Sequence, residues 1–264
     1  MRNTLRIALS LAVLALPAAA IAQSQVALPT QTTADVSAVA PQGHALTPFV
    51  AQYKVVRGGV SLGQATLQVH PTQGNRWQAD LRMRGTGVMS LVGIHIDSSS
   101  VFDLVGERFR PISQATTRRA SLFGSKQAVG IYDWTARTAK WSGDVKEARR
   151  RPVALQDGDL NGLLINLAVV RDARPGAALS YRFVDEGRVR NHQYRVASAP
   201  EVITVNGLEY QTYRVTRTDA GHTSDETVLW VVPGGDTPIR MLQREDGKDM
   251  YDLQLLEYQK GATP

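Results

Sequence analysis

The chain has 264 residues, a formal net charge of +6 and no cysteine. The absence of cysteine excludes a disulfide framework, a thiolate metal site, a cysteine nucleophile and the lipid-modified cysteine of a bacterial lipoprotein. The positive charge is mild: it suits the neighbourhood of anionic lipids, but it is also common on soluble proteins.

Residues 1–22 have the pattern of a cleavable secretory signal peptide. Arg2 and Arg6 provide a positive start, residues 7–16 form a short apolar core, and Ala20-Ile21-Ala22 supplies the small residues that a signal peptidase reads. The alternative is a transmembrane anchor, which needs roughly 20 apolar residues. Because this apolar run is shorter, we expect a cleaved signal peptide, export to the periplasm and no transmembrane anchor after cleavage. A nucleic-acid partner is not expected for an exported chain.

Residues 23–47 are rich in Ala, Gln, Thr, Val and Pro and show no periodicity, which predicts a disordered tether. Residues 48–258 are predicted to form a single β-rich domain, followed by a tail over 259–264. Its dominant pattern is strand-like alternation, seen clearly where apolar residues recur at every second position from Trp77 to Met83.

Gly58-Gly59 predicts a hairpin turn between two such strands, one starting at Phe49 and one running through Leu67. Turns are also expected at Val105-Gly106, Glu186-Gly187, Asn206-Gly207, Gly234-Gly235 and Asp246-Gly247. Further strands are predicted at 94–103, 108–117, 126–134, 137–142, 178–185, 188–198, 201–205, 208–218, 225–232, 238–244 and 249–258.

One segment, at about 159–171, has helical spacing instead. Asp159 is the expected N-cap, Arg171 and Arg174 suit the C-terminal end of the helix dipole, and Pro175-Gly176 stops the helix. The apolar stripe predicted to pack on a sheet consists of Leu160, Leu163, Leu164, Leu167 and Val170. A shorter apolar segment, Gly87–Gly93, is interpreted as a helical turn or as a loop that plugs an opening.

These elements predict a mainly β fold: a strongly curved antiparallel sheet or incomplete β-barrel with one packed amphipathic helix. The competing architecture is an outer-membrane barrel. Against it stand the helix, the irregular strand lengths and the low aromatic content of 6%.

Several strings, in order along the chain, resemble a bacterial family catalogued as domain of unknown function 3108. They are Pro48-Phe49-Val50-Ala51-Gln52-Tyr53, Gly59-Val60-Ser61-Leu62-Gly63, Arg110-Pro111-Ile112, Arg118-Arg119, Tyr132-Asp133-Trp134, the segment 159–167, Trp230-Val231-Val232-Pro233 and Pro238-Ile239-Arg240. The chain departs from the family pattern at Tyr132, where phenylalanine is usual, and at Ser98-Ser99-Ser100, where charges are usual. The resemblance implies a periplasmic β-rich protein and supplies no activity or catalytic residues.

No catalytic or metal-binding motif stands out, so we expect no metal and no cofactor. His95, Asp97 and Ser99 share one strand face, but at roughly 6.5–7 Å per step they are too far apart for a catalytic triad. His222, Asp225 and Glu226 are interpreted as a polar loop because no second histidine lies at ligand spacing. Six carboxylates remain possible members of a glycosidase pair, none singled out: Asp80, Asp97, Asp103, Asp133, Asp185 and Glu226.

Arginine and tryptophan supply the candidate ligand-binding residues. Guanidinium groups bind phosphate or carboxylate, and indole planes stack on sugars, although both also serve as edge-strand charges and core fillers. Lys146 with Arg149–Arg151 is the densest basic cluster. The candidates on strands are Arg82, Arg84, Arg118, Arg119, Trp134 and Trp141, whereas Trp77 is expected in the core.

The leading hypothesis is a non-enzymatic binding protein for a hydrophobic or amphiphilic envelope molecule, such as a lipid or glycolipid. A concave apolar sheet face with basic residues at its rim would form the site. The alternatives are an assembly factor that contacts an envelope partner through an edge strand or Gly87–Gly93, and an enzyme acting on envelope polysaccharide.

Overall fold

The computed structural model describes residues 45–86, 95–120, 124–219 and 226–261. Most of these residues belong to one antiparallel sheet, as the alternation predicts. The helical segments are η1 (Glu147–Arg149) and α2 (Gly162–Asp172). The strands are β1 (Phe49–Arg57), β2 (Val60–Pro71), β3 (Arg76–Gly85), β4 (His95–Val105), β5 (Arg108–Ala120), β6 (Gly124–Asp133), β7 (Thr138–Gly143), β8 (Val153–Ala154), β9 (Ala178–Asp185), β10 (Arg188–Val196), β11 (Glu201–Val205), β12 (Leu208–Arg217), β13 (Glu226–Val231), β14 (Arg240–Glu245) and β15 (Lys248–Lys260).

The strand order within the described residues is β8-β7-β6-β5-β4-β3-β2-β1-β15-β14-β13-β12-β10-β9, with β11 paired to β12. The first strand therefore lies between the second and the last. The predicted strands match these elements within a few residues at each end, whereas β8 and η1 were not predicted. The result is a curved antiparallel sheet whose two ends, β8 and β9, do not pair with each other.

Hairpin turns occur where Gly-containing pairs predict them. Glu186-Gly187, Asn206-Gly207 and Asp246-Gly247 each place both residues at positive φ, between 45° and 78°. A two-residue turn with this backbone matches the right-handed twist of antiparallel strands. The predicted turns at these positions are confirmed.

The main core lies on the concave side of the sheet. Along β1, Phe49, Ala51 and Tyr53 are buried, and on β3 Ala79 is buried while Trp77 packs against the same cluster. Successive strand residues point to opposite faces, so the predicted alternation places one apolar row inside. The core role predicted for Trp77 is confirmed.

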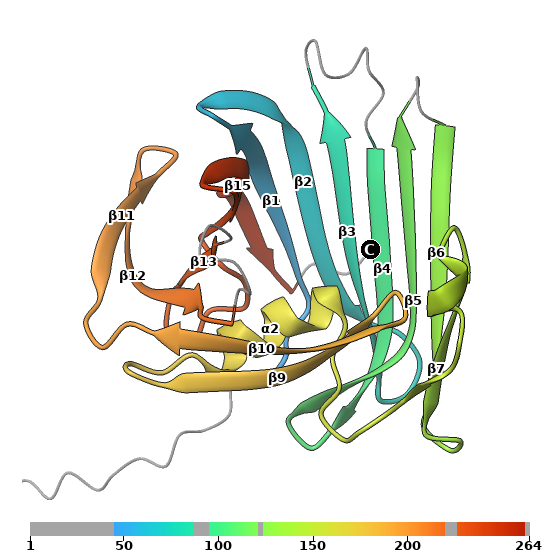
Figure 1. The fold of residues 1–264 in the computed structure, drawn as a ribbon. Coiled ribbons are helices and arrows are strands. Elements are labelled where there is room, and N and C mark those ends of the chain that lie inside the picture. Colours follow the sequence, from blue (N-terminus) through green and yellow to red (C-terminus); the bar gives the residue numbers. More distant parts are fainter. Residues whose placement is uncertain (1–44, 87–94, 121–123, 220–225, 262–264) are drawn as a thin grey trace, which may run out of the picture. The chain divides into compact units, whose positions relative to one another are not determined.

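Helix α2 lies across the concave side above β9 and β10 (Figure 1) and contacts β3, β4, β5 and β9. Leu164 and Val169 are fully buried, so the predicted packed helix is confirmed. The predicted N-cap is wrong: Asn161 caps the helix, its side chain accepting from the backbone N–H of Leu164 at 3.2 Å. Asp159 instead lies before the helix, where its buried carboxylate binds Arg182.

The two ends of the sheet meet through side chains at what we call the seam, formed by β5–β7, residues 155–161 and β9. Val184 of β9 is fully buried in a second cluster with Tyr132 and Trp141. The Tyr132 hydroxyl donates to the Val184 carbonyl at 2.7 Å. Leu160 forms a parallel bridge with Phe183, so a loop residue covers the edge of β9.

Charged and polar pairs reinforce the seam. Arg182 Nη1 donates to both carboxylate oxygens of Asp159, at 2.7 and 2.5 Å. The Gln114 side chain donates to Asp185, which also accepts from the backbone N–H of Gly162 at 3.1 Å. Burial raises the pKa of Asp185, and the hydrogen bonds from Gln114 and Gly162 oppose that rise only in part.

Three predicted features lie outside the described residues: the signal peptide, the tether up to residue 44 and the Gly87–Gly93 segment. Of the helices within the described ranges, none is long and apolar enough to cross a membrane.

Candidate functional site

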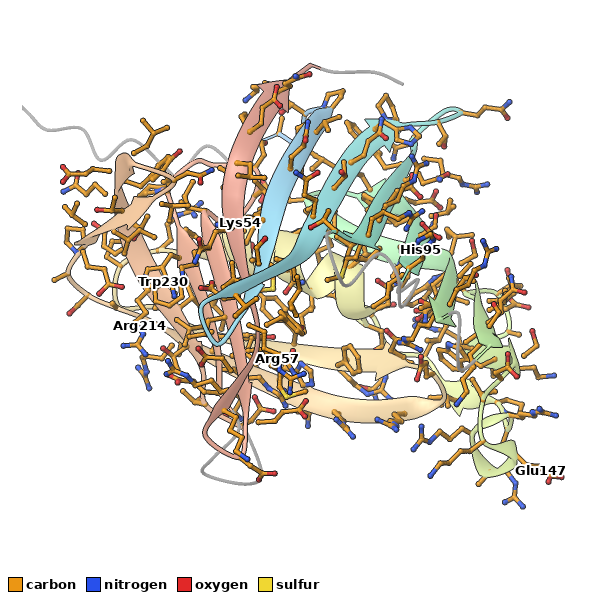
Figure 2. The ribbon with its side chains drawn as sticks, turned by 90° about the horizontal axis from the view of Figure 1, so that it is seen from above. Lys54, Arg57, His95, Glu147, Arg214 and Trp230 are labelled. Carbon is orange, nitrogen blue, oxygen red and sulfur yellow. The ribbon has the colours of Figure 1, made fainter. Side chains whose placement is uncertain are left out.

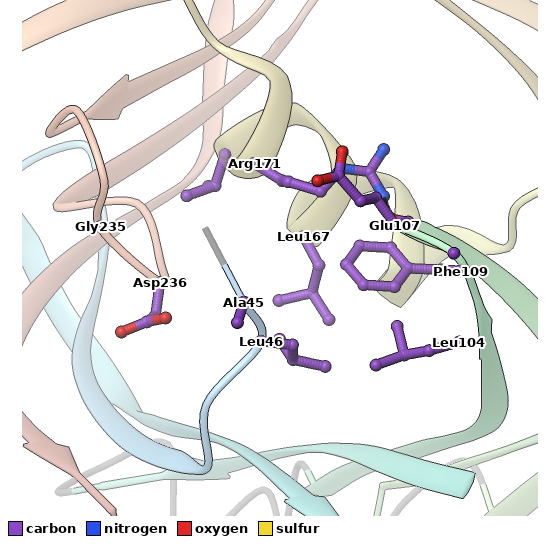
Figure 3. A pocket seen from close by; sticks show the side chains of 11 residues that line it. Ala45, Leu46, Leu104, Glu107, Phe109, Leu167, Arg171, Gly235 and Asp236 are labelled. Carbon is purple, nitrogen blue, oxygen red and sulfur yellow. Dashed lines mark hydrogen bonds between the residues drawn. The ribbon is translucent and has the colours of Figure 1, made fainter. Parts of the chain in front are cut away.

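An open apolar pocket of about 270 Å³ lies at the C-terminal end of α2, and we call it the helix-end pocket. Figure 3 shows Leu46, Leu104, Phe109 and Leu167 around the hollow. Leu104 and Phe109 face each other across the β4–β5 hairpin, and Leu167 comes from α2. Residues distant in sequence thus form an apolar lining that the curvature of the sheet brings together.

The rim of this pocket carries a fixed cation. The Arg171 guanidinium lies 4.7 Å from the Phe109 ring centroid, within cation–π range. Its Nε and Nη2 donate to the two carboxylate oxygens of Asp172 at 2.6 and 2.7 Å, and Nη1 donates to the Glu107 carbonyl. Burial disfavours the charged guanidinium, but the hydrogen bonds and charge of Asp172 outweigh it and raise the Arg171 pKa.

Tyr181 holds Asp172 in place from β9. The Tyr181 hydroxyl donates to the Asp172 carboxylate at 2.8 Å and lies 3.2 Å from the Ala168 carbonyl oxygen. Burial, and then the charge of Asp172, raise the pKa of Tyr181, which keeps the phenol protonated as a donor. The cation at the rim is therefore held by a chain of contacts rather than by solvent.

The opposite wall of the pocket, at Gly235-Asp236, also borders a second hollow of about 470 Å³. Leu208, Leu256 and Tyr258 line that hollow and remain more than a third exposed. Apolar surface thus continues on both sides of the β13–β14 loop.

A third apolar hollow, of about 310 Å³, lies at the other end of the strands. Arg84, one of the predicted ligand-binding residues, borders it with Arg57, Met83 and Tyr251. Arg84 is already engaged: Nη2 donates to Asp97 at 2.5 Å.

The predicted ligand-binding residues are not brought together. Arg82, Arg84 and Arg119 lie on the outer face of β3 and β5, since Arg84 and Arg119 both pair with His95. Arg118 points to the opposite face, where it reaches Glu186 at 3.1 Å. Ligand binding by these arginines stays a prediction.

The two predicted tryptophans also lie apart from the helix-end pocket. Trp134 is half-buried and its Nε1 donates to the Pro111 carbonyl at 2.7 Å. Trp141 is 3% exposed and packs edge-on against Tyr132 at 5.6 Å. Trp141 thus contributes to the seam, and its role toward a ligand is untested.

Each carboxylate that the sequence offered as a catalytic candidate has a partner in the fold. Asp133 accepts from the backbone N–H of Ala136 at 2.8 Å, the turn role that its position predicts. Glu226 forms ion pairs with Arg214 and Arg244, each at 2.9 Å, on an outer face where Arg214 lies beside Trp230 (Figure 2). The other partnerships are Asp80 with Gln78, Asp97 with Arg84, Asp103 with Arg76 and Arg110, and Asp185 with Gln114.

Among the residues with described positions, no three His, Asp or Glu side chains are grouped to hold a metal ion. His222 and Asp225 lie outside the described residues. The helix-end pocket combines an apolar lining with an arginine that is paired to Asp172 at its rim.

Sequence reasoning missed the helix-end pocket. Arg171 was noted only as a cation suited to the end of a helix, and Phe109 only as part of a strand. Their contact depends on how α2 crosses β4 and β5, for which the sequence carries no local signal.

A family model described as "Protein of unknown function (DUF3108)" matches residues 52–254. No curated protein matches. Among solved structures, the chain is similar to a beta-barrel-like protein of domain of unknown function DUF1849 from Brucella abortus, with a TM-score of 0.55 and 9% identity. That alignment covers 81% of this chain and 98% of the other, and at this identity it shows a shared fold alone.

Proposed function

Because the chain belongs to the family described as protein of unknown function DUF3108, we propose its function from the site alone. The protein is a non-enzymatic binding protein for a hydrophobic or amphiphilic molecule of the cell envelope, such as a lipid or glycolipid. The observation that carries the proposal is the helix-end pocket, an apolar hollow open to solvent with a fixed arginine at its rim.

The apolar lining suits an alkyl or acyl chain. Leu104 and Leu167 contribute aliphatic surface and Phe109 contributes an aromatic face. Transfer of each methylene group from water to such a surface contributes about 0.8 kcal/mol. The pocket volume of about 270 Å³ is close to the lower end of typical ligand sites, about 300 Å³. A short chain, or one end of a longer chain, is the expected occupant.

The rim suits a polar head group. Arg171 is protonated and paired with Asp172, while Glu107 and Asp236 border the same opening. Asp236 is itself engaged, since it accepts from Thr47 at 3.2 Å and lies 3.5 Å from Lys260 Nζ. A head group with both hydrogen-bonding and charged groups fits this mixed rim better than a purely apolar molecule does.

Probe titration tests the proposal. We expect the delipidated protein to enhance the fluorescence of cis-parinaric acid, a fatty acid whose emission rises in an apolar site. Ala45 is exposed and lines the pocket, so Ala45→Trp should fill the hollow without disturbing the core. We expect this variant to bind the probe at least about tenfold more weakly, a loss of about 1.4 kcal/mol.

Ala136→Trp is the matched control, because Ala136 is also exposed but lies in the turn after β6 and does not line the pocket. It should bind the probe like the unmodified protein. Equal binding by all three proteins, or no binding by any, would refute the pocket as the site.

A second candidate, an assembly factor that contacts an envelope partner, is favoured by β11. This strand pairs only with β12 among the described strands, and Val202 on it is 63% exposed. An exposed apolar edge strand is a template for pairing with another chain. If the protein contacts a partner through β11, crosslinking in cells should give one dominant protein adduct that Val202→Lys removes. A uniformly monomeric crosslinking pattern would argue against the assembly-factor function.

A further inference from the structure

Basic side chains from separate parts of the chain gather at the seam. Arg118 of β5 lies directly opposite Lys126 of β6. Arg118 Nη1 also reaches the carboxylate of Glu186 at 3.1 Å, in the β9–β10 turn that leads into Arg188. Basic residues of β5, β6 and β10 therefore lie at one place.

The segment 146–151 joins them through a close backbone contact. A Cβ atom built on Gly187 would lie 2.1 Å from the Arg149 carbonyl oxygen, and Gly187 has a φ of +69°. Only glycine fits such a position, so the turn and the segment touch directly. We call the resulting group the seam patch; it consists of Arg118, Lys126, Lys146, Arg149, Arg150, Arg151 and Arg188.

Most of these charges lack the carboxylate partner that several other arginines of the described residues have. Arg240 pairs with Asp252 at 2.8 Å, and Arg76 pairs with Asp103 at 3.2 Å. Of the seam patch, only Arg118 has a carboxylate partner within the described ranges. Arg150 donates to the Gly143 carbonyl at 3.1 Å, which leaves its charge uncompensated.

The patch is accessible and lacks stacking planes. An open hollow of about 490 Å³ lies between Arg150, Arg151, Ala148 and Glu147, and Figure 2 shows nitrogen-tipped side chains gathered around Glu147. Tyr132 and Trp141 of the underlying strands are each 3% exposed. Recognition of single-stranded nucleic acid relies on exposed aromatic faces for stacking, which these buried rings cannot supply.

We propose that the seam patch binds the phosphate head groups of an anionic membrane surface. Guanidinium groups bind phosphate oxygens bidentately, and clustered Lys and Arg side chains are attracted to anionic lipid surfaces. Charge complementarity selects this partner: the patch offers several uncompensated cations on an exposed surface with no stacking plane. The proposal does not depend on the helix-end pocket, which lies at the other end of α2 from the seam.

Vesicle cosedimentation of the full chain tests the proposal. We expect binding to phosphatidylcholine vesicles that contain phosphatidylglycerol, no binding to phosphatidylcholine alone, and weakening as salt screens the charges. The triple variant Arg149→Gln/Arg150→Gln/Arg151→Gln should bind on the order of 100-fold more weakly, since each basic residue contributes about fivefold. Lys126→Gln/Arg188→Gln, on different strands, should lower binding by more than about tenfold.

The matched control is Lys54→Gln/Arg195→Gln/Lys248→Gln, which removes the same charge from β1, β10 and β15 at positions outside the seam patch. It should retain binding within about twofold, and Ala45→Trp should bind vesicles normally. Equal losses in both triple variants would show that only net charge matters and would overturn the proposal. Binding to heparin, a soluble polyanionic polysaccharide, without binding to vesicles would overturn it as well.

Discussion

The buried ion pair of the seam gives the sharpest prediction for the fold. Asp159 is fully buried, and both its oxygens accept from Arg182 Nη1, at 2.7 and 2.5 Å. The same carboxylate accepts from the backbone N–H of Gln156 at 2.8 Å. Its charge therefore depends on Arg182 for compensation.

Replacing Arg182 with methionine keeps most of the side-chain length but leaves the buried Asp159 carboxylate without its ion-pair partner. Removal of one partner of a buried pair costs about 3–5 kcal/mol, because the other charge remains unpaired and desolvated. We expect Arg182→Met to lower the free energy of unfolding by that amount, measured by urea denaturation. Adding Asp159→Asn removes the unpaired negative charge and should recover part of the lost free energy of unfolding.

Arg76→Met is the control, because Arg76 is 49% exposed and its partner Asp103 keeps a second arginine, Arg110. An exposed pair contributes at most about 1 kcal/mol. If Arg182→Met costs no more than Arg76→Met, the seam does not depend on this pair and the reasoning is refuted.

Further predictions concern the core, the seam turn and one histidine. Leu164→Ala in the middle of α2, where the side chain is fully buried, should cost about 2–5 kcal/mol in urea unfolding; a loss below about 1 kcal/mol would contradict the packing described. Gly187→Ala should destabilise more than Gly207→Ala, since both have positive φ but only Gly187 meets a neighbouring backbone; equal losses in melting temperature would argue against the contact. Burial, and then the positive charge of Arg217, lower the pKa of His192 to about 4 from 6.5. As the pH falls, His192 is therefore protonated in the unfolded chain before it is protonated in the folded protein. The free energy of unfolding decreases as the pH falls from 6.5 to about 4, by at most about 3 kcal/mol, and by less where water reaches the imidazole ring. His192→Phe should flatten the pH dependence of unfolding in that window, and an unchanged slope would contradict the assignment.

The strands and turns were predictable because their signals are local. Alternation from Trp77 to Met83 follows from the two faces of a strand, and Asn206-Gly207 follows from the backbone that a tight hairpin requires. The helix was predictable for the same reason, but its start was not. Asp159 has the right chemistry for an N-cap, yet its tertiary contact with Arg182 takes it out of that role.

The seam and the helix-end pocket could not be predicted, because both arise from contacts between distant segments. The Val184 carbonyl accepts from the Tyr132 hydroxyl, and Arg171 lies over Phe109, across long stretches of chain. The basic cluster at Arg149–Arg151 was visible in the sequence, whereas its approach to the β9–β10 turn depends on the close fit at Gly187.

The most direct test of the proposed function is mass spectrometry of what the protein carries. Organic extracts of the purified protein and of Ala45→Trp would be compared, and amphiphiles would then be added back to the delipidated chains. We predict an amphiphile in the first extract, its depletion in the second, and rebinding only to the unmodified protein. No co-purifying amphiphile together with no binding of one added back would contradict the central claim.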